Sequence, residues 1–361
     1  MSAESSTKKS ENENFDQQQL IKAAKYYWST LLLIWLALGI YFASPYYKSF
    51  LTLDTKIALR DLAVIYTLGA PAMYYYALKK ARLSPSRAYI ALTTLRRLLK
   101  EYGKYLKNLN SRAFYPAPAI SREERTNLLF MVVKFFFLPL MLNFLVANIG
   151  SVRHSIDIIH SQGLQLSLAN FNALLYPFLF SALIFIDTAY FTFGYAVESS
   201  ALNNKVVSVD PTFLGWATAL ICYPPFNAYG VQILNWHADD YRAFGHTGYT
   251  TILYFVILVL MFIYTAASVA LGAKASNLTN RGIVSRWPYS FVRHPAYISK
   301  NLAWWLTLLP IFSLTVALSM TAWTFIYFLR AITEERHLMM VDNGYKEYAK
   351  NVQWRFIPKV I

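Results

Sequence analysis

The chain has 361 residues, of which 56% are hydrophobic and 15% are charged, and its mean hydropathy is +0.32. So few charged side chains cannot cover the surface of a soluble protein, so the composition excludes that class and predicts an all-α, polytopic integral membrane protein. In such a protein the net charge of +15 indicates a basic cytoplasmic membrane face with anionic lipid as partner, and no nucleic-acid partner.

The first 271 residues contain a tail and six apolar segments. Residues 1–26 are polar and low in complexity, and we expect a disordered tail there. Each apolar segment in 27–271 is long enough for one helix across a hydrocarbon core of about 30 Å. These segments are 28–46, 62–78, 128–149, 171–197, 212–234 and 250–271. The sequence therefore predicts a membrane domain with six spans over residues 27–271.

A strongly basic segment, 79–125, follows the second predicted span. It contains twelve Lys or Arg residues against three Glu. The positive-inside rule places this segment in the cytoplasm, and the alternation of spans then places both termini there. The location predicted for the protein is the bacterial inner membrane or the endoplasmic reticulum.

Within the basic segment, residues 87–109 read as an amphipathic helix. Apolar residues recur at helical spacing, from Ala88 through Leu95 and Leu99 to Leu106, while lysines and arginines project elsewhere. One interpretation is a helix that lies in the membrane interface against anionic lipid. The alternative is a helix packed on the protein's own cytosolic surface.

The fourth predicted span contains a charge, Asp187. A carboxylate at membrane depth should face protein or a water-filled cavity, with Lys134, Lys205 or a tyrosine hydroxyl as its partner. A structural role and a role in the substrate site are both open.

The sequence predicts no metal site. Two histidines and two aspartates occur in 237–246, but without a defined ligand spacing, so we expect a solvated loop there. The single cysteine, Cys222, excludes an internal disulfide and a cysteine-pair zinc site.

Two polar segments in residues 272–361 carry the clearest motifs. The first reads Arg293-His294-Pro295-Ala-Tyr297, and the second reads Arg330-Ala-Ile-Thr-Glu334-Glu335-Arg-His-Leu, followed by Tyr345, Tyr348, Arg355 and Pro358. Together they resemble the isoprenylcysteine carboxyl methyltransferase family and its phospholipid methyltransferase relatives. The resemblance covers roughly the last 80 residues. It implies a methyltransferase-like region over 272–361 that binds S-adenosylmethionine.

The resemblance transfers a cofactor role to the matching positions. These are Arg293, His294, Pro295, Tyr297, Arg330, Glu334 and Glu335. We expect one of the two glutamates to hold the amino group or ribose of the cofactor, and one of the two arginines to pair with its carboxylate or to brace the glutamates. The histidine and tyrosine of the first motif would form a wall near adenine, and the proline would fix the turn.

The methyl acceptor is expected to be lipophilic: an isoprenoid, a lipid or a lipidated protein. A carboxylate or thiol is nucleophilic once ionised, whereas an amine or carbon acceptor has to lose a proton. The candidate catalytic residues that would remove this proton are His294, Glu335 and Tyr348. Candidate substrate contacts are Asp187, Asn301, Trp305 and Arg355. The oligomeric state is left open.

Residues 302–329 separate the two motifs and are apolar. The segment has 28 residues, whereas one span needs about 20 and two need about 40. A single crossing would put the motifs on opposite sides of the membrane. We therefore expect a tight helical hairpin with a turn near Pro310, which makes eight spans in total.

Two other functions remain open. The chain's ending also resembles that of membrane sterol reductases that use NADPH, although Glu334-Glu335 fits the methyltransferase pattern better. The second alternative is a non-enzymatic membrane scaffold that uses the basic amphipathic helix.

Overall fold

The computed structural model describes residues 2–80, 83–108, 116–163, 165–228, 242–341 and 343–360. It describes their side chains from residue 17 on, with the exception of residue 343. The chain is mostly helical, at 76%. Its helices are α1 (Ser2–Ala43), α2 (Pro45–Phe50), α3 (Leu53–Lys79), α4 (Arg87–Lys107), α5 (Arg122–Gln162), α6 (Leu168–Asn170), α7 (Tyr176–Ala196), α8 (Phe213–Leu220), α10 (Thr247–Leu271), α11 (Pro295–Thr307), α12 (Leu314–Val341) and α13 (Asn343–Asn351). Short π or 3₁₀ turns are η1 (Phe171–Leu175), η2 (Gly272–Lys274) and η3 (Leu309–Ile311), and the strands are β1 (Ser208–Val209) and β2 (Thr279–Asn280).

Five helical segments of the described chain are long and apolar enough to cross a membrane, as expected of a membrane protein. They are Gln17–Ala43, Arg122–Gln162, Leu168–Ala196, Thr247–Lys274 and Leu314–Val341. Each overlaps a segment that the sequence predicts to be apolar and spanning. The helix α1 also runs through residues 2–26, where the sequence predicts a disordered tail.

The remaining predicted spans have a different form. The second coincides with α3, which is not among the five. The fifth is represented by α8, whose eight residues reach only about 12 Å, and residues 229–234 of that span lie outside the described part of the chain. Residues 237–241 of the predicted loop 237–246 also lie outside it. Eight spans therefore stay a prediction.

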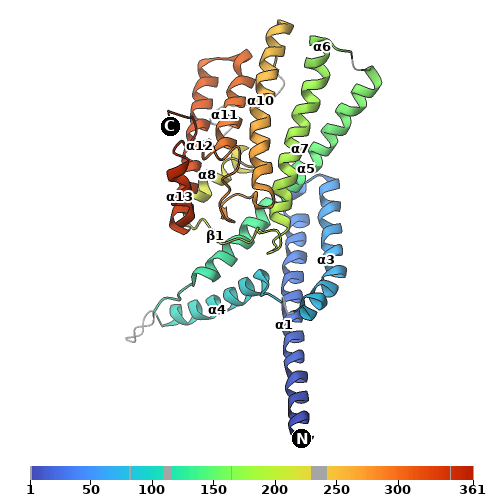
Figure 1. Ribbon diagram of the computed structural model, residues 1–361, viewed down its shortest axis with the longest axis vertical. Coiled ribbons are helices and arrows are strands. Elements are labelled where there is room, and N and C mark those ends of the chain that lie inside the picture. The colour runs from blue at the N-terminus through green and yellow to red at the C-terminus, as the bar shows by residue number, and fades with distance from the viewer. Residues whose placement is uncertain are drawn as a thin grey trace. The chain divides into compact units, whose positions relative to one another are not determined.

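The chain forms two compact units, Met1–Phe135 and Phe136–Ile361. In the first unit α3 and α4 both pack against α1 (Figure 1). A hydrogen bond of 2.8 Å between the hydroxyls of Thr30 and Ser86 connects α1 to the residue that precedes α4. Ser86 also caps α4, because its hydroxyl accepts a hydrogen bond from the Tyr89 amide.

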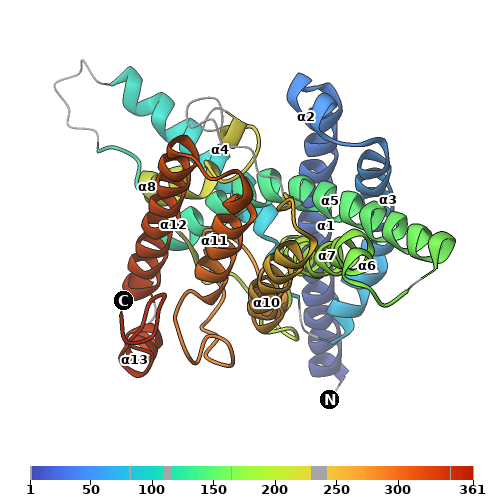
Figure 2. The same ribbon diagram turned by 90° about the horizontal axis from the view of Figure 1, so that it is seen from above.

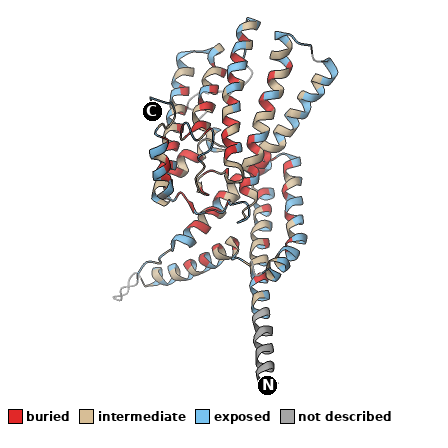
Figure 3. Cartoon of the chain, in the orientation of Figure 1, coloured by how far each residue is buried: buried red, intermediate tan, exposed pale blue. Residues whose placement is uncertain are grey.

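The second unit is a layer of helices in which α10 lies between α7 and α11, and α12 lies beyond α11 (Figures 1 and 2). Residues Leu253, Ile257, Met261 and Tyr264 recur on one face of α10 and are buried. Figure 3 shows buried residues in red along the helices of this unit. The rings of Tyr176 and Tyr254 stack 3.7 Å apart between α7 and α10. This apolar core holds the helices that carry the two motifs.

A two-stranded antiparallel sheet stands at the end of this layer. Ser208 of β1 is paired with Asn280 of β2, and Val209 is paired with Thr279. The sequence analysis did not predict this sheet. Its signal is weak, because each strand has only two residues and the β-branched residues near β1 are limited to Val206, Val207 and Val209. The sheet nevertheless fixes the loop that follows α10 beside α12.

Candidate functional site

The two motif segments meet in the structure. The amide of Arg293 donates to the carbonyl oxygen of Trp354 at 2.9 Å, and the amide of His294 donates to the carbonyl oxygen of Arg355 at 2.9 Å. Pro295 then occupies the first turn of α11, where its missing N–H costs nothing. The first motif is therefore joined by its backbone to the chain's C-terminal segment.

Glu335 of α12 is the centre of this junction. Only 2% of the residue is exposed. One carboxylate oxygen accepts from Arg293 Nε at 2.7 Å and lies 3.1 Å from His294 Nε2. The other accepts from Nε and Nη2 of Arg355, at 3.0 and 2.9 Å. Such charge-assisted bonds are the strong ones, so Glu335 holds α12, α11 and the C-terminal segment together.

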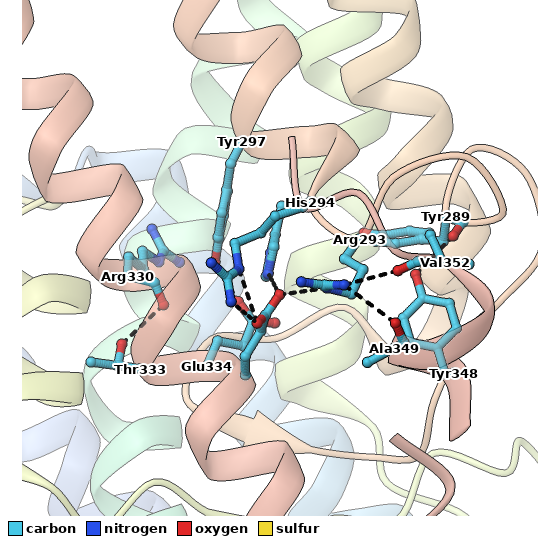
Figure 4. Close-up of polar contacts among 12 residues, drawn as sticks. Tyr289, Arg293, His294, Tyr297, Arg330, Thr333, Glu334, Tyr348, Ala349 and Val352 are labelled. Atoms are coloured by element: carbon cyan, nitrogen blue, oxygen red, sulfur yellow. Dashed lines mark hydrogen bonds and ion pairs between the residues drawn. The ribbon is translucent and has the colours of Figure 1, made fainter. Parts of the chain in front are cut away.

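Arg293 has a second set of partners on its other side. Its Nη1 donates to the carbonyl oxygens of Val352 and Gln353 at 2.9 and 2.8 Å, and more distantly to Ala349 (Figure 4). These partners of the guanidinium all belong to the protein itself. Of the two roles that the sequence leaves open for an arginine, the geometry favours bracing a glutamate.

Glu334 is in the opposite situation from its neighbour. It is exposed, and its Oε2 accepts a hydrogen bond of 2.7 Å from the Tyr297 hydroxyl. Residues spaced by three or four lie on one face of a helix, so Arg330, Glu334 and His337 share a face of α12 that Glu335 does not. This face lines a cavity.

A stack of planar groups forms one wall of the cavity. The His294 ring lies parallel to the Tyr297 ring, at 5.3 Å between centroids and 5° between planes. The Arg330 guanidinium lies 5.2 Å from the Tyr297 ring centre and also donates to Asn277 Oδ1. The wall that the sequence predicts from His294 and Tyr297 therefore exists as a geometric feature, with a buried cation added to it.

The cavity has a volume of about 170 Å³. This is more than ten times the space that one water needs, roughly 15 Å³. Six of the predicted site residues line it: Arg293, His294, Tyr297, Arg330, Glu334 and Tyr348. The cavity is also lined by residues 274 and 276–284, from the loop that contains β2. Within that loop Gly282 has φ of +89°, a conformation that favours glycine.

Three tyrosines close the end of the cavity near the C-terminal segment: Tyr289, Tyr345 and Tyr348. The Tyr348 hydroxyl donates to the carbonyl oxygen of Tyr289 at 2.7 Å. Burial raises the pKa of Tyr348, and the nearby carboxylates of Glu335 and Glu334 add to this increase. The Tyr348 phenol therefore keeps its proton at neutral pH. This protonation and the hydrogen bond to Tyr289 favour a role in positioning the site over a role as general base.

The structure also places residues in the cavity that the sequence analysis did not single out. Asn277 and Asn280 belong to the polar run that directly follows α10, and Lys300 and His337 belong to the motif segments. The Asn280 side chain is buried, and its Nδ2 has no hydrogen-bond partner among the residues that the structure describes. The available signal was the polar run itself, which lies between an apolar span and the first motif.

Asp187 does not line the cavity but lies close behind it. Its carboxylate accepts hydrogen bonds from the hydroxyls of Tyr264, at 2.7 Å, and Ser268. The prediction of a tyrosine hydroxyl as partner is thus confirmed. Tyr264 and Ser268 both line the cavity, and Lys300 Nζ donates to the Tyr264 hydroxyl at 3.3 Å.

The other substrate candidates lie elsewhere too. Trp305 Nε1 donates to Thr324 Oγ1 at 3.0 Å, and that hydroxyl donates to Asn301 Oδ1 at 3.1 Å, so both residues connect α11 to α12. Arg355 is occupied with Glu335. All four substrate candidates therefore have hydrogen-bond partners within the protein.

Comparison of the chain with protein-family models, curated proteins and solved structures finds no match. The functional interpretation consequently rests on the geometry of the site and on the two motifs.

Proposed function

We propose that this protein is an integral-membrane, S-adenosylmethionine-dependent methyltransferase that acts on a lipophilic acceptor. The observation that carries the proposal is the convergence of both motif segments on one cavity. That cavity combines an exposed carboxylate, Glu334, a buried guanidinium, Arg330, and the aromatic side chains around them.

The chemistry of the lining fits each part of the cofactor. Glu334 can accept hydrogen bonds from an ammonium group or ribose hydroxyls, because only one of its oxygens is engaged by Tyr297. Arg330 and the unpartnered Nδ2 of Asn280 can donate to a carboxylate. The rings of His294 and Tyr297 offer a flat surface to adenine, and tyrosine faces attract a cation.

The cofactor would supply an electrophilic methyl group on a sulfonium. The chain's own residues would hold the reactants in line and exclude water from them. His294, Glu335 and Tyr348 are each engaged in hydrogen bonds with the protein, so we assign them to positioning the site. This arrangement suits an acceptor that is already ionised and needs no general base.

The proposed membrane arrangement keeps the site on the cytosolic face, with both termini there. The 13 residues of α11 reach about 20 Å, and the chain reverses through η3 into α12. The outward residues of these helices, among them Leu302, Leu314, Leu318 and Phe325, are apolar and exposed. They support a hairpin that faces lipid, from which a lipophilic acceptor can enter the cavity.

Thermal unfolding of the purified protein in detergent tests the proposal. A ligand that binds only the folded state stabilises it by about 2.7 kcal/mol at 100 times its Kd. We expect S-adenosylmethionine to raise Tm and NADPH to leave it unchanged. A rise with NADPH alone would support the reductase instead, and no rise with either would leave the scaffold as the better account.

The acceptor can be sought separately. Cells with and without the gene are grown on methyl-labelled methionine, and their lipids and lipidated proteins are compared by mass spectrometry. The proposal requires a labelled lipophilic product that is present only with the gene.

A further inference from the structure

The helix α4 presents three different faces, and no residue of α4 lines the cavity described above. Its packed face consists of Ala88, Ala91, Thr94 and Leu98, all buried. The helix is held in place at both ends of this face. Arg87 Nη1 donates to Asn127 Oδ1 at 2.9 Å, so the start of α4 is fixed to α5.

The second anchor lies halfway along the helix, at Arg97. Arg97 donates to both carboxylate oxygens of Glu124 at 2.9 Å and to Glu101 at 2.8 Å. It also donates to the Ala119 carbonyl oxygen at 3.1 Å. These bonds determine which residues of α4 can turn away from the protein.

The residues that turn away form a continuous apolar stripe: Leu95, Leu99, Tyr102 and Leu106. Their spacing of four, three and four residues keeps them on one side of the helix. They are exposed by 47%, 67%, 42% and 62%. A single exposed leucine is ordinary, but four aligned large side chains on a fixed helix form a surface that water does not favour.

A basic face flanks this stripe. Arg96, Lys100, Lys104 and Lys107 are all exposed. At 100° per residue, these side chains lie between about a quarter and half a turn around the helix from the stripe. An apolar face beside a basic face is the pattern of a helix that lies in the plane of a membrane surface containing anionic lipid.

The neighbouring end of α3 also carries residues that are typical of the headgroup level of a membrane. α3 ends in the exposed tyrosines Tyr75 and Tyr76, whose rings are covered by Lys79 and Lys80 at 4.8 and 5.7 Å. Aromatic and basic residues of this kind collect at the headgroup level. In addition, Figure 1 shows α4 crosswise to α1, which contains a candidate span.

We propose that α4 is an interfacial helix whose stripe enters the headgroup region of the membrane while its basic face contacts anionic lipid. Both interpretations drawn from the sequence then apply, each to a different face: one packs on the protein and the other binds the membrane. The occupant is an anionic lipid surface because the flanking charge is entirely positive.

The test uses the full chain in vesicles, with Cys222→Ser as background so that one introduced cysteine carries an environment-sensitive fluorophore. Leu99→Cys reports on the stripe, and the adjacent exposed Lys100→Cys is its matched control. Tyr102→Cys provides a second stripe position. The vesicles contain phosphatidylcholine with or without phosphatidylglycerol, and quenching by brominated lipid and by aqueous iodide is measured.

We expect the label at 99 and 102 to emit further to the blue and to be quenched mainly by brominated lipid, whereas the label at 100 is quenched mainly by iodide. Phosphatidylglycerol should strengthen the lipid quenching at 99. Replacing Arg96, Lys104 and Lys107 with glutamine should remove that increase.

Equal iodide quenching at 99, 100 and 102 would show that the stripe faces water and would overturn the proposal. So would cross-linking between two Leu99→Cys copies without lipid quenching, because a second copy of the chain would then cover the stripe. If phosphatidylglycerol had no effect on quenching, the assignment of an anionic partner would be wrong.

Discussion

At the scale of single residues, two adjacent glutamates have opposite environments. Glu335 is buried and bonded to three basic side chains, whereas Glu334 is exposed in the cavity and bonded to one tyrosine. Successive residues of a helix point about 100° apart, so α12 can direct one carboxylate to the protein and the next to a ligand. The motif names both residues, but only the structure separates their roles.

This difference predicts opposite effects for Glu334→Gln and Glu335→Gln. Removing one partner of a buried ion pair costs about 3–5 kcal/mol, so Glu335→Gln should lower the free energy of unfolding by roughly 3 kcal/mol. Glu334→Gln should change stability by less than about 0.5 kcal/mol, because the residue is exposed.

Binding should show the reverse pattern. A hydrogen bond to a charged group contributes about 1.5–3 kcal/mol, so Glu334→Gln should weaken S-adenosylmethionine binding by roughly tenfold or more. Chemical denaturation in detergent measures stability, and titration calorimetry measures affinity. Equal stability losses in the two variants, or unchanged affinity in Glu334→Gln, would contradict this division.

At the scale of helices, Asp187 connects three of them. It lies on α7, its partners Tyr264 and Ser268 lie on α10, and Lys300 of α11 donates to Tyr264. From hydropathy the sequence predicted a costly charge with Lys134, Lys205 or a tyrosine hydroxyl as its partner. It could not identify which tyrosine, because that depends on how α7 and α10 pack.

Substitution at Asp187 distinguishes the structural role from the substrate role. Asp187→Ala leaves two buried hydroxyls without their acceptor, and we expect it to destabilise the protein by about 3 kcal/mol. Asp187→Asn keeps an acceptor oxygen at the same place and should lose less than half as much. A variant Asp187→Asn with native Tm but no methyl transfer would instead support direct contact with the substrate.

The packing of α7 against the turn after α10 depends on one glycine. A Cβ on Gly194 would overlap the backbone oxygen of Ala275, which cannot move as a flexible side chain would. We expect Gly194→Ala to destabilise the protein by about 1–3 kcal/mol. Gly150→Ala in α5, where nothing lies within 4 Å, is the control and should stabilise by up to about 1 kcal/mol. Thermal unfolding of both variants provides the comparison, and similar shifts would show that the close approach is unimportant.

At the scale of the whole chain, hydropathy predicted the membrane class and the position of most long helices. It did not predict β1 and β2, because a pairing of two residues depends on contacts between distant segments rather than on local pattern. The sequence analysis named Asn301 and Trp305 as candidate substrate contacts, and the structure adds that both are hydrogen-bonded to Thr324. Motif spacing indicates which residues share a site, but not which of them face the ligand.

The order of the two motifs along the chain does not determine on which side of the membrane each motif lies. Cysteine labelling tests this directly. The backbone bonds from Arg293 to Trp354 and from His294 to Arg355 require the two segments to lie on the same side. Ser290 and Lys350 are exposed near these segments, and Phe312 is exposed at the turn between α11 and α12. In a Cys222→Ser background, Ser290→Cys and Lys350→Cys should react equally with an impermeant maleimide added from the cytosolic side.

Phe312→Cys should resist the reagent from that side, because the predicted hairpin carries it into the membrane. Permeabilised vesicles control for cysteines that are accessible but slow to react. Opposite accessibility of positions 290 and 350 would mean that the membrane separates the motifs, and no single cofactor could then contact both. Equal reaction at all three positions would leave the shared site intact and exclude the hairpin, since residues 290, 312 and 350 would then all stand in the cytosol and neither α11 nor α12 would cross the membrane.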